Sequence, residues 1–251
     1  LGYTARLLLT DAPIKPVLSK NKINWTMPEL KMIAASGCVK ELLELIAGSE
    51  SGAAEYDAYN SCWGEVTYNP ASKGYNGGVG GGTTNGASLN KWLAAWGKPL
   101  SQMTIKEAGN TQATFKHINQ YKKKGSWFNQ PKNQPKGCRA FAIGKYQFIP
   151  ATYRGVLAGM REMSMSDLWD GEMQEAWAIY LLMKKRYSTI GTFLLGYHKD
   201  VHRAQKGVAM EWASAPLSKD YMWEGKLKKK NYSWYVDVGI NPDKEFPSSV
   251  A

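Results

Sequence analysis

The feature that most constrains the fold of this chain is a helical segment that ends at a Glu and gives way to a Gly-rich polar stretch. Between residues 28 and 49 the apolar side chains recur at helical spacing, and Gly37 can divide the segment into two helices. Residues 51–90 are instead rich in Gly, Asn, Ser, Thr and Tyr, which is typical of loops and short strands. The contrast predicts a helical protein with a polar lobe inserted early.

Later segments also carry helix signals. Thr104 and Glu107 have the spacing of a capping box, which predicts a helix from about residue 105. Pro150 suits the first position of another helix. A further helix is expected to be capped by Ser166 or Asp167 and to reach residue 186, and residues 200–213 again have a helical pattern. The predicted fold class is therefore mainly α, within the α+β type.

The charge of the chain restricts its partners. The 251 residues carry a formal net charge of +11, which favours anionic polymers such as nucleic acid, anionic lipid or bacterial cell wall. No helix-turn-helix, zinc-finger or RNP motif is present, so specific nucleic-acid recognition is not expected. No stretch of about 18 apolar residues occurs, so no membrane span is expected either.

The metal-ligating and nucleophilic residue types give weak signals. His198 and His202 have the spacing of a zinc pair but lack the Glu of the metalloprotease motif, and no metal or cofactor is predicted. Cys62 and Cys138 flank a long polar insert that a disulfide can close, although their pairing stays open. Cys38 lies within a helical pattern and is predicted to be a buried small apolar residue.

Glu50 is the residue with the most suggestive position. It follows the apolar stretch 42–47 and precedes the polar loop, so its carboxylate is expected to be poorly hydrated. Poor hydration raises the pKa of an acid, and the negative end of a helix acts in the same direction. Such a Glu can remain protonated near neutral pH and serve as the general acid of glycosidic bond cleavage. The alternative interpretation is an ordinary solvated residue at a helix end.

A second segment, Gly144-Lys145-Tyr146-Gln147-Phe148-Ile149-Pro150, gives this Glu a context. The pair Glu50-Ser51 followed by this segment resembles the lysozyme-like superfamily, which includes lytic transglycosylases and phage endolysins of the lambda type. Residues 174–178 and 212–216 are also similar, so the resemblance extends over residues 38–217. The insert between the first two motifs is longer than in the small phage enzymes.

The resemblance implies an architecture as well as a fold. It implies a lysozyme-like fold with a small β- and loop-rich lobe inserted after the first catalytic helix. Residues 1–27 would form an irregular N-terminal segment or linker, and residues 28–217 the catalytic domain. Residues 218–251, which have no counterpart in the family, would form a C-terminal extension packed on that domain.

The resemblance also implies a site. Glu50 would protonate the oxygen that joins N-acetylmuramic acid to N-acetylglucosamine, and Gly144 would allow close approach of sugar or backbone. Tyr146 either stacks on a sugar ring or belongs to a buried strand. The predicted substrate-binding set is completed by three further polar residues, namely Ser49, Tyr59 and Gln147.

The second carboxylate decides the mechanism. Glu55 and Asp57 follow Glu50 closely enough in the chain to fold back toward it. Either could be the second carboxylate with which a hydrolase, here a lysozyme, activates water or stabilises positive charge. If neither does so, a lytic transglycosylase is favoured, in which the 6-hydroxyl of the muramic sugar attacks. A hypothesis of another class is a non-catalytic module that binds cell wall or nucleic acid.

The resemblance implies a biological setting in general terms. The partner would be the glycan strands of peptidoglycan, and a monomer acting in the bacterial periplasm or cell wall is expected. No signal peptide is visible, so a phage lysis machinery or a secretion system would deliver the protein. A secreted antibacterial effector would additionally require a cognate immunity protein.

Overall fold

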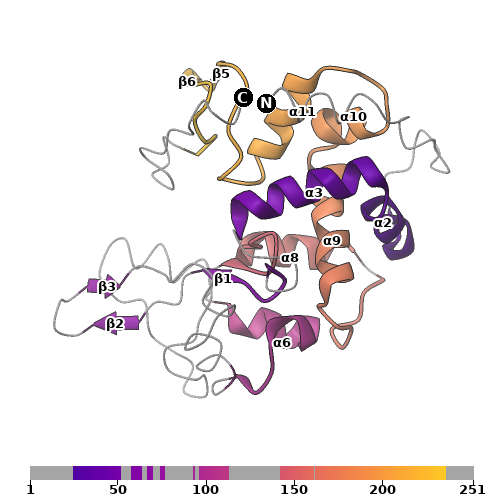
Figure 1. Ribbon diagram of the computed structural model, residues 1–251, viewed down its shortest axis with the longest axis vertical. Coiled ribbons are helices and arrows are strands. Elements are labelled where there is room, and N and C mark those ends of the chain that lie inside the picture. The colour runs from indigo at the N-terminus through magenta and orange to yellow at the C-terminus, as the bar shows by residue number, and fades with distance from the viewer. Residues whose placement is uncertain are drawn as a thin grey trace. The chain divides into compact units, whose positions relative to one another are not determined.

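The computed structural model of the protein is mainly helical, which confirms the predicted fold class at that level (Figure 1). It describes residues 25–51, 58–63, 67–69, 74–76, 93, 96–112, 142–160 and 162–235. None of the helices in these ranges is long and apolar enough to cross a membrane. The chain divides into two compact units, Leu1–Ser49 with Ala176–Ala251, and Glu50–Glu175. The predicted domain 28–217 therefore contains parts of both units.

The first described part of the first unit is the helical segment predicted from the apolar spacing. Helix α2 (Met27–Ala34) starts after Thr26, whose backbone N–H donates to the Glu29 carboxylate at 2.9 Å. Helix α3 (Gly37–Glu50) follows after a short break, so the predicted division at Gly37 is confirmed. Each helix buries one apolar face, whose side chains include Leu30, Ile33, Val39, Leu42, Leu43 and Ile46. Cys38 is half-buried rather than buried as predicted.

Helix α9 (Gly171–Tyr180) crosses from the second unit into the first and continues as irregular helix. The π-helical turns η2 (Leu181–Lys185) and η3 (Tyr187–Gly191) lead into α10 (Thr192–Leu194) and then α11 (Val201–Ala209). The predicted caps of α9 are wrong, because the Asp170 carboxylate accepts the Met173 N–H at 2.9 Å. Asp167 instead accepts the N–H of Ser164 at 2.9 Å and closes a turn.

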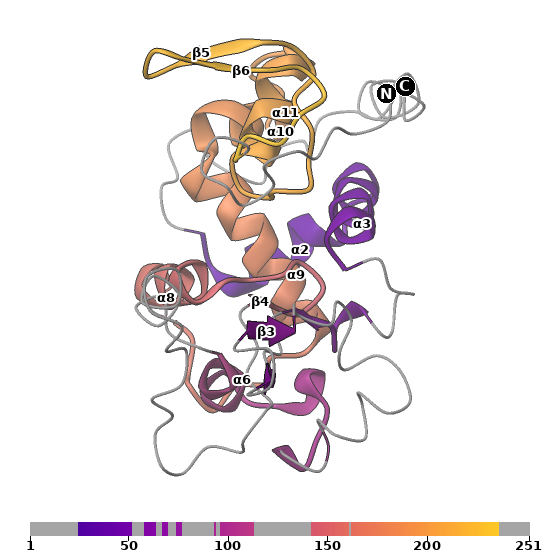
Figure 2. The same cartoon turned by 90° about the vertical axis from the view of Figure 1, so that its left-hand side faces the viewer.

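The described part of the C-terminal extension contains a β-hairpin. Strands β5 (Tyr221–Trp223) and β6 (Lys226–Lys228) pair antiparallel and lie beside α11 (Figures 1 and 2). The two turn residues, Glu224 and Gly225, both have positive φ, as a two-residue hairpin turn requires. A small core of Ala209, Leu217 and Trp234 joins this segment to the end of α11.

The second unit contains the short strands expected in the polar insert. Strand β1 (Cys62–Trp63) pairs antiparallel with β4 (Ala142–Ile143), and β2 (Thr67–Asn69) pairs with β3 (Gly74–Asn76). The helices described in this unit include η1 (Leu100–Gln102), α6 (Ile105–Thr111) and α8 (Pro150–Gly159), and Pro150 is at the first position of α8 as predicted. Whether Cys62 and Cys138 form a disulfide stays open, because Cys138 lies outside the described residues.

An aromatic core holds the second unit together. Trp169 is fully buried, and its ring centroid lies 5.9 Å from that of Phe148 and 5.5 Å from that of Tyr153. The Tyr153 hydroxyl donates to the Ile105 carbonyl at 2.5 Å, which ties α8 to the start of α6. The backbone N–H of Trp169 donates to the Met103 carbonyl at 2.8 Å. Trp169 is therefore fixed by its backbone as well as its ring.

Helix α6 has the predicted capping box, and its Glu gives a pH-dependent prediction. The Glu107 carboxylate accepts the Thr104 N–H at 2.8 Å and pairs with the Lys98 ammonium at 2.8 Å. Lys98 first, and the Thr104 N–H second, lower the pKa of Glu107 from 4.5 to about 2. Because the folded pKa is the lower one, this stabilisation is present above pH 4.5 and is lost as the pH falls toward 2.

We therefore expect Glu107→Gln to lower the midpoint of thermal unfolding at neutral pH, with the difference from wild type shrinking as the pH falls from 4.5 toward 2. Unfolding followed by circular dichroism across this range measures the effect. Glu162→Gln removes the same charge from an exposed position of the same unit and serves as the control. A difference that stays constant with pH would contradict the prediction.

Candidate functional site

Glu50 is the last residue of α3, as the sequence predicts. The helix behind it buries Val39, Leu43 and Ile46, and Glu50 itself is half-buried. Its backbone lies at the C-terminal end of the helix, where the carbonyl groups carry partial negative charge. Glu50 is also the first residue of the second unit. The proposed role as general acid stays a prediction, but the local setting on which it was based is present.

Ser49 precedes Glu50 and is held by the first unit. Its hydroxyl donates to the Ile46 carbonyl at 2.8 Å and accepts a hydrogen bond from the Ser214 hydroxyl at 2.9 Å. Ser214 belongs to the stretch 212–216 that contributes to the resemblance. The side chain of Ser49 is exposed, and its contacts fix the last turn of α3. Its predicted contact with substrate stays a prediction.

The segment Gly144 to Gln147 forms the tip of a short hairpin. Ile143 and Phe148 bracket it with two backbone hydrogen bonds, of 3.2 and 2.8 Å. The Gln147 backbone N–H and side-chain amide both donate to the Gly144 carbonyl, at 3.1 and 2.8 Å. Gly144 and Gln147 have φ values of +78° and +49°. The segment is therefore a tight, internally bonded turn.

Gly144 allows the close approach of two protein side chains. Gly144 is buried, and a Cβ at this position would lie 2.7 Å from Cη2 of Trp169 and closer still to Oε1 of Gln174. Its backbone N–H donates to the Ser61 carbonyl at 2.8 Å. Protein atoms therefore pack closely around Gly144, and its predicted contact with a sugar stays a prediction.

Tyr146 is a core residue. Its side chain is 1% exposed, and its ring meets the Phe148 ring edge-on with centroids 6.1 Å apart. A ring that stacks on a sugar needs an exposed face, so the structure favours the alternative that the sequence left open. Gln147 differs, because it is half-buried and lies at the end of the turn. Of the predicted contacts in this segment, Gln147 is the one with accessible side-chain surface.

A polar cluster beside the turn contains residues that sequence reasoning did not select. Lys145 is 1% exposed, and its ammonium lies 3.4 Å from Oε1 of Glu175 and 3.2 Å from the Tyr59 hydroxyl. The Tyr59 hydroxyl donates to the same Glu175 oxygen at 2.6 Å. The Glu175 side chain is 21% exposed. Tyr59, predicted as a substrate contact, therefore helps to hold a buried ion pair.

Gln174 orders this cluster from within. Its Oε1 accepts the Lys145 N–H at 2.9 Å, and its Nε2 donates to the carbonyls of Tyr59 and Trp169 at 3.0 and 3.2 Å. The side chain is fully buried, so each of these bonds replaces one to water. Gln174 and Glu175 begin the stretch 174–178 of the resemblance. The similarity of that stretch was the one signal in the sequence that could have identified these two residues.

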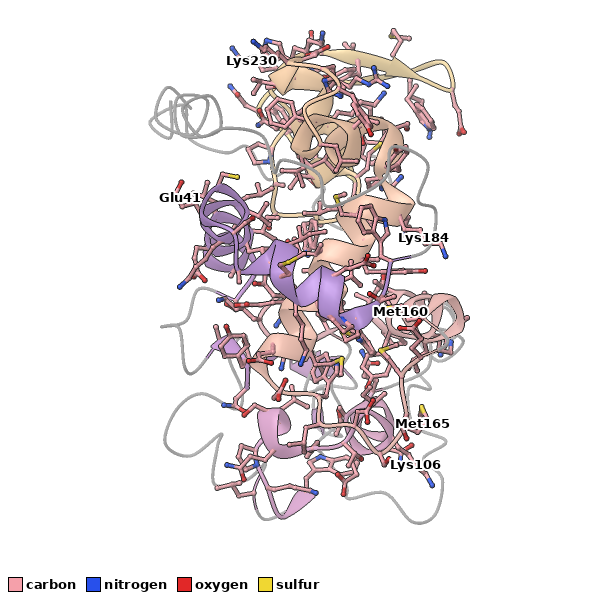
Figure 3. The ribbon with its side chains drawn as sticks, turned by 90° about the vertical axis from the view of Figure 1, so that its right-hand side faces the viewer. Glu41, Lys106, Met160, Met165, Lys184 and Lys230 are labelled. Atoms are coloured by element: carbon pink, nitrogen blue, oxygen red, sulfur yellow. The ribbon has the colours of Figure 1, made fainter. Side chains whose placement is uncertain are left out.

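The second carboxylate is not assigned by the described residues, because Glu55 and Asp57 both lie outside them. Glu41, which lies on α3, is exposed and points away from the helix (Figure 3). Glu175 is a partly buried carboxylate of the second unit. Because it already accepts from Tyr59 and faces Lys145, it is occupied as a structural acceptor.

The two histidines with zinc-like spacing do not share a helix. His198 precedes α11, and its Nε2 lies 3.0 Å from the Thr189 carbonyl oxygen. His202 lies on α11, with Nδ1 2.9 Å from the Ser218 hydroxyl. Within the described ranges, no group of three or more His, Cys, Asp or Glu side chains is arranged to hold a metal ion.

Comparisons with protein-family models, with curated proteins and with solved structures find no match. Interpretation of the site therefore depends on the motifs and on the geometry of the described residues.

Proposed function

We propose that the chain is a peptidoglycan muramidase, a lysozyme, with Glu50 as its general acid. The observation that carries the proposal is the position of Glu50, half-buried at the end of the apolar helix α3. The same compact unit contains the tight turn from Gly144 to Gln147, the second motif of the lysozyme-like resemblance.

The chemistry requires a neutral carboxylic acid near neutral pH. Partial burial and the negative end of the helix both disfavour the charged form of a carboxyl group. A protonated Glu50 would donate its proton to the bridging oxygen between N-acetylmuramic acid and N-acetylglucosamine as the glycosidic bond breaks. Water would then add to the anomeric carbon and transfer one proton to the second carboxylate. Glu55 or Asp57 is the proposed second carboxylate of that step.

Gln147 is the proposed sugar contact within the turn. Its side-chain amide donates to the Gly144 carbonyl at 2.8 Å, so its orientation is set before substrate arrives. A fixed amide loses little conformational entropy when it binds a sugar hydroxyl. The buried neighbours Lys145 and Tyr146 would support this turn from inside rather than touch the glycan.

The net charge of +11 supports a substrate that is part of an anionic wall. Long-range attraction between a cationic protein and an anionic polymer raises the rate of association. The exposed lysines include Lys184 and Lys230, whose side chains point outward (Figure 3). We place the action of the protein in the bacterial periplasm or cell wall, where the substrate is located.

Digestion of purified peptidoglycan, followed by mass spectrometry of the soluble fragments, tests the proposal. A lysozyme is expected to release glycan fragments whose reducing end is N-acetylmuramic acid. Fragments with 1,6-anhydro ends, which lack one water, would replace the proposal with a lytic transglycosylase. Retention on the wall without any soluble fragment would overturn both enzymes in favour of a binding module.

A further inference from the structure

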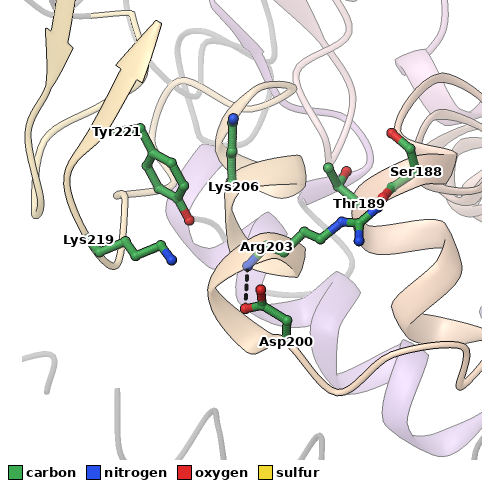
Figure 4. A pocket seen from close by; sticks show the side chains of 7 residues that line it. All are labelled: Ser188, Thr189, Asp200, Arg203, Lys206, Lys219 and Tyr221. Carbon is green, nitrogen blue, oxygen red and sulfur yellow. Dashed lines mark hydrogen bonds between the residues drawn. The ribbon is translucent and has the colours of Figure 1, made fainter.

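A pocket in the first unit is separate from every residue of the proposed lysozyme site. Its volume is about 380 Å³, within the size range of small-molecule sites. Its walls come from three segments, which are η3, the beginning of α11 and the chain entering β5 (Figure 4). The side chains that line it are all polar or charged, namely Ser188, Thr189, Asp200, Arg203, Lys206, Lys219 and Tyr221.

The charges of this lining are unequal. Three cationic side chains and one carboxylate, Asp200, give a formal charge of +2. Asp200 caps α11 by accepting the Arg203 N–H at 3.0 Å, and this bond followed by nearby Lys219 lowers its pKa. In the described part of the chain, Arg203, Lys206 and Lys219 form no ion pair with a carboxylate. The pocket therefore has an excess of positive charge.

Lys206 is held against aromatic rings. Its ammonium lies 4.8 Å from the ring centroid of Tyr221, 5.1 Å from that of Trp223 and 5.3 Å from that of Trp234. Burial, and then repulsion by Lys219, lowers the pKa of Lys206. An ammonium that has lost part of its water gains more from an anion than a fully hydrated one does.

The Arg203 side chain extends toward the η3 wall of the pocket. Its Nη2 donates to the Ser188 carbonyl, which fixes the guanidinium against η3 (Figure 4). A planar guanidinium presents paired N–H donors that match the oxygen atoms of phosphate or carboxylate. Tyr221 is fixed as well, because its hydroxyl donates to the His202 carbonyl at 2.8 Å. The walls are thus positioned before a ligand binds.

We propose that this pocket binds a small phosphomonoester. A phosphomonoester carries a charge of about −1.5 to −2 at pH 7, which matches the +2 of the lining. A carboxylate or a phosphodiester carries one negative charge and would leave the pocket positive. The volume also exceeds that of an inorganic ion, so a small organic group attached to the phosphate can be accommodated. This inference does not depend on the proposed lysozyme activity.

Isothermal titration of the full chain at low salt tests the site, with glycerol 3-phosphate, dimethyl phosphate and acetate as probes. We expect glycerol 3-phosphate to bind at least about tenfold more tightly than dimethyl phosphate or acetate, because the dianion neutralises the pocket. Binding of the monoester no tighter than that of dimethyl phosphate, or no detectable binding, would overturn the proposal.

Variants localise the binding. Lys219→Ala is expected to weaken glycerol 3-phosphate binding at least about fivefold, since one charge-assisted contact is lost. Lys219 is exposed, so the variant is expected to fold. Lys40→Ala removes the same charge from an exposed position on α3 and is expected to leave the affinity unchanged. Equal effects of the two substitutions would show that the attraction is diffuse and would overturn the site.

The failure of this proposal is distinguishable from failure of the proposed function. Glu50→Gln is expected to leave glycerol 3-phosphate binding unchanged, because Glu50 does not line the pocket. Conversely, Lys219→Ala is expected to retain activity in a wall-lysis assay, because Lys219 is not part of the proposed lysozyme site. Arg203→Lys keeps the charge but loses the planar fork and its hydrogen bond to the Ser188 carbonyl, so it should weaken binding of the monoester while Lys40→Ala does not.

Discussion

Glu50→Gln is expected to abolish wall lysis while leaving the protein folded. Gln has nearly the shape of Glu but cannot donate the proton that the departing sugar oxygen requires. Removal of a general acid typically costs a factor of about 10²–10⁴ in rate. Release of soluble fragments from purified peptidoglycan measures the activity, and sedimentation with insoluble walls measures binding, which should persist.

The stability of the same variant separates a catalytic role from a structural one. A protonated Glu50 carries no charge at the C-terminal end of α3, so replacing it with the neutral Gln should not destabilise the helix. The unfolding midpoint is therefore expected to stay the same or rise slightly. Glu41→Gln provides the control, because it removes one exposed carboxylate from the same helix. Lysis by Glu50→Gln at the rate of the Glu41→Gln control would refute the role of Glu50.

The sequence was sufficient wherever a structural feature depends on residues a few positions apart. The capping box of Thr104 and Glu107 and the Pro150 start of α8 are local signals, and both helices begin where predicted. The end of α3 at Glu50 follows from the change from apolar spacing to a polar stretch. These features need no knowledge of distant neighbours.

Predictions failed where distant segments select between local alternatives. Asp167 and Asp170 are both suitable caps for α9 by type. The backbone N–H of Ile105 donates to the Asp167 carbonyl at 2.8 Å, and this contact holds Asp167 in the preceding turn, so Asp170 becomes the cap. The hairpin formed by β5 and β6 was missed because Lys-rich sequence masked its alternation, although the pair Glu224-Gly225 was a usable turn signal.

The candidate site shows the same limit. Local sequence cannot tell whether Lys145 and Tyr146 at the tip of a turn face solvent or protein. Gln174, about thirty positions later, accepts the Lys145 N–H and turns the segment inward. Tyr146 consequently becomes core, and Lys145 pairs with Glu175 instead of remaining on the surface. A motif thus indicated the right segment but not the direction of its side chains.

Gly144→Ala is expected to destabilise the second unit by about 3 kcal/mol. An L-residue with positive φ costs roughly 1–2 kcal/mol, and Gly144 has a φ of +78°. The added methyl group would also overlap Gln174 and approach Cη2 of Trp169 at 2.7 Å. Overpacking of this kind costs about 1–3 kcal/mol. Neither neighbour can move cheaply, because both are fully buried and Gln174 makes three hydrogen bonds.

Gly155→Ala supplies a matched control for the same chemical change. Gly155 lies within α8 of the same unit, and a Cβ there meets nothing within 4 Å. Ala is preferred over Gly inside a helix by about 0.5–1 kcal/mol, so this variant should be slightly more stable than wild type. Denaturant unfolding followed by tryptophan fluorescence compares the two, since Trp169 reports directly on the packing around Gly144. If Gly144→Ala unfolded at the same denaturant concentration as Gly155→Ala, the turn would not be packed against Gln174 and Trp169, and the buried setting assigned to Lys145 and Tyr146 would fall with it.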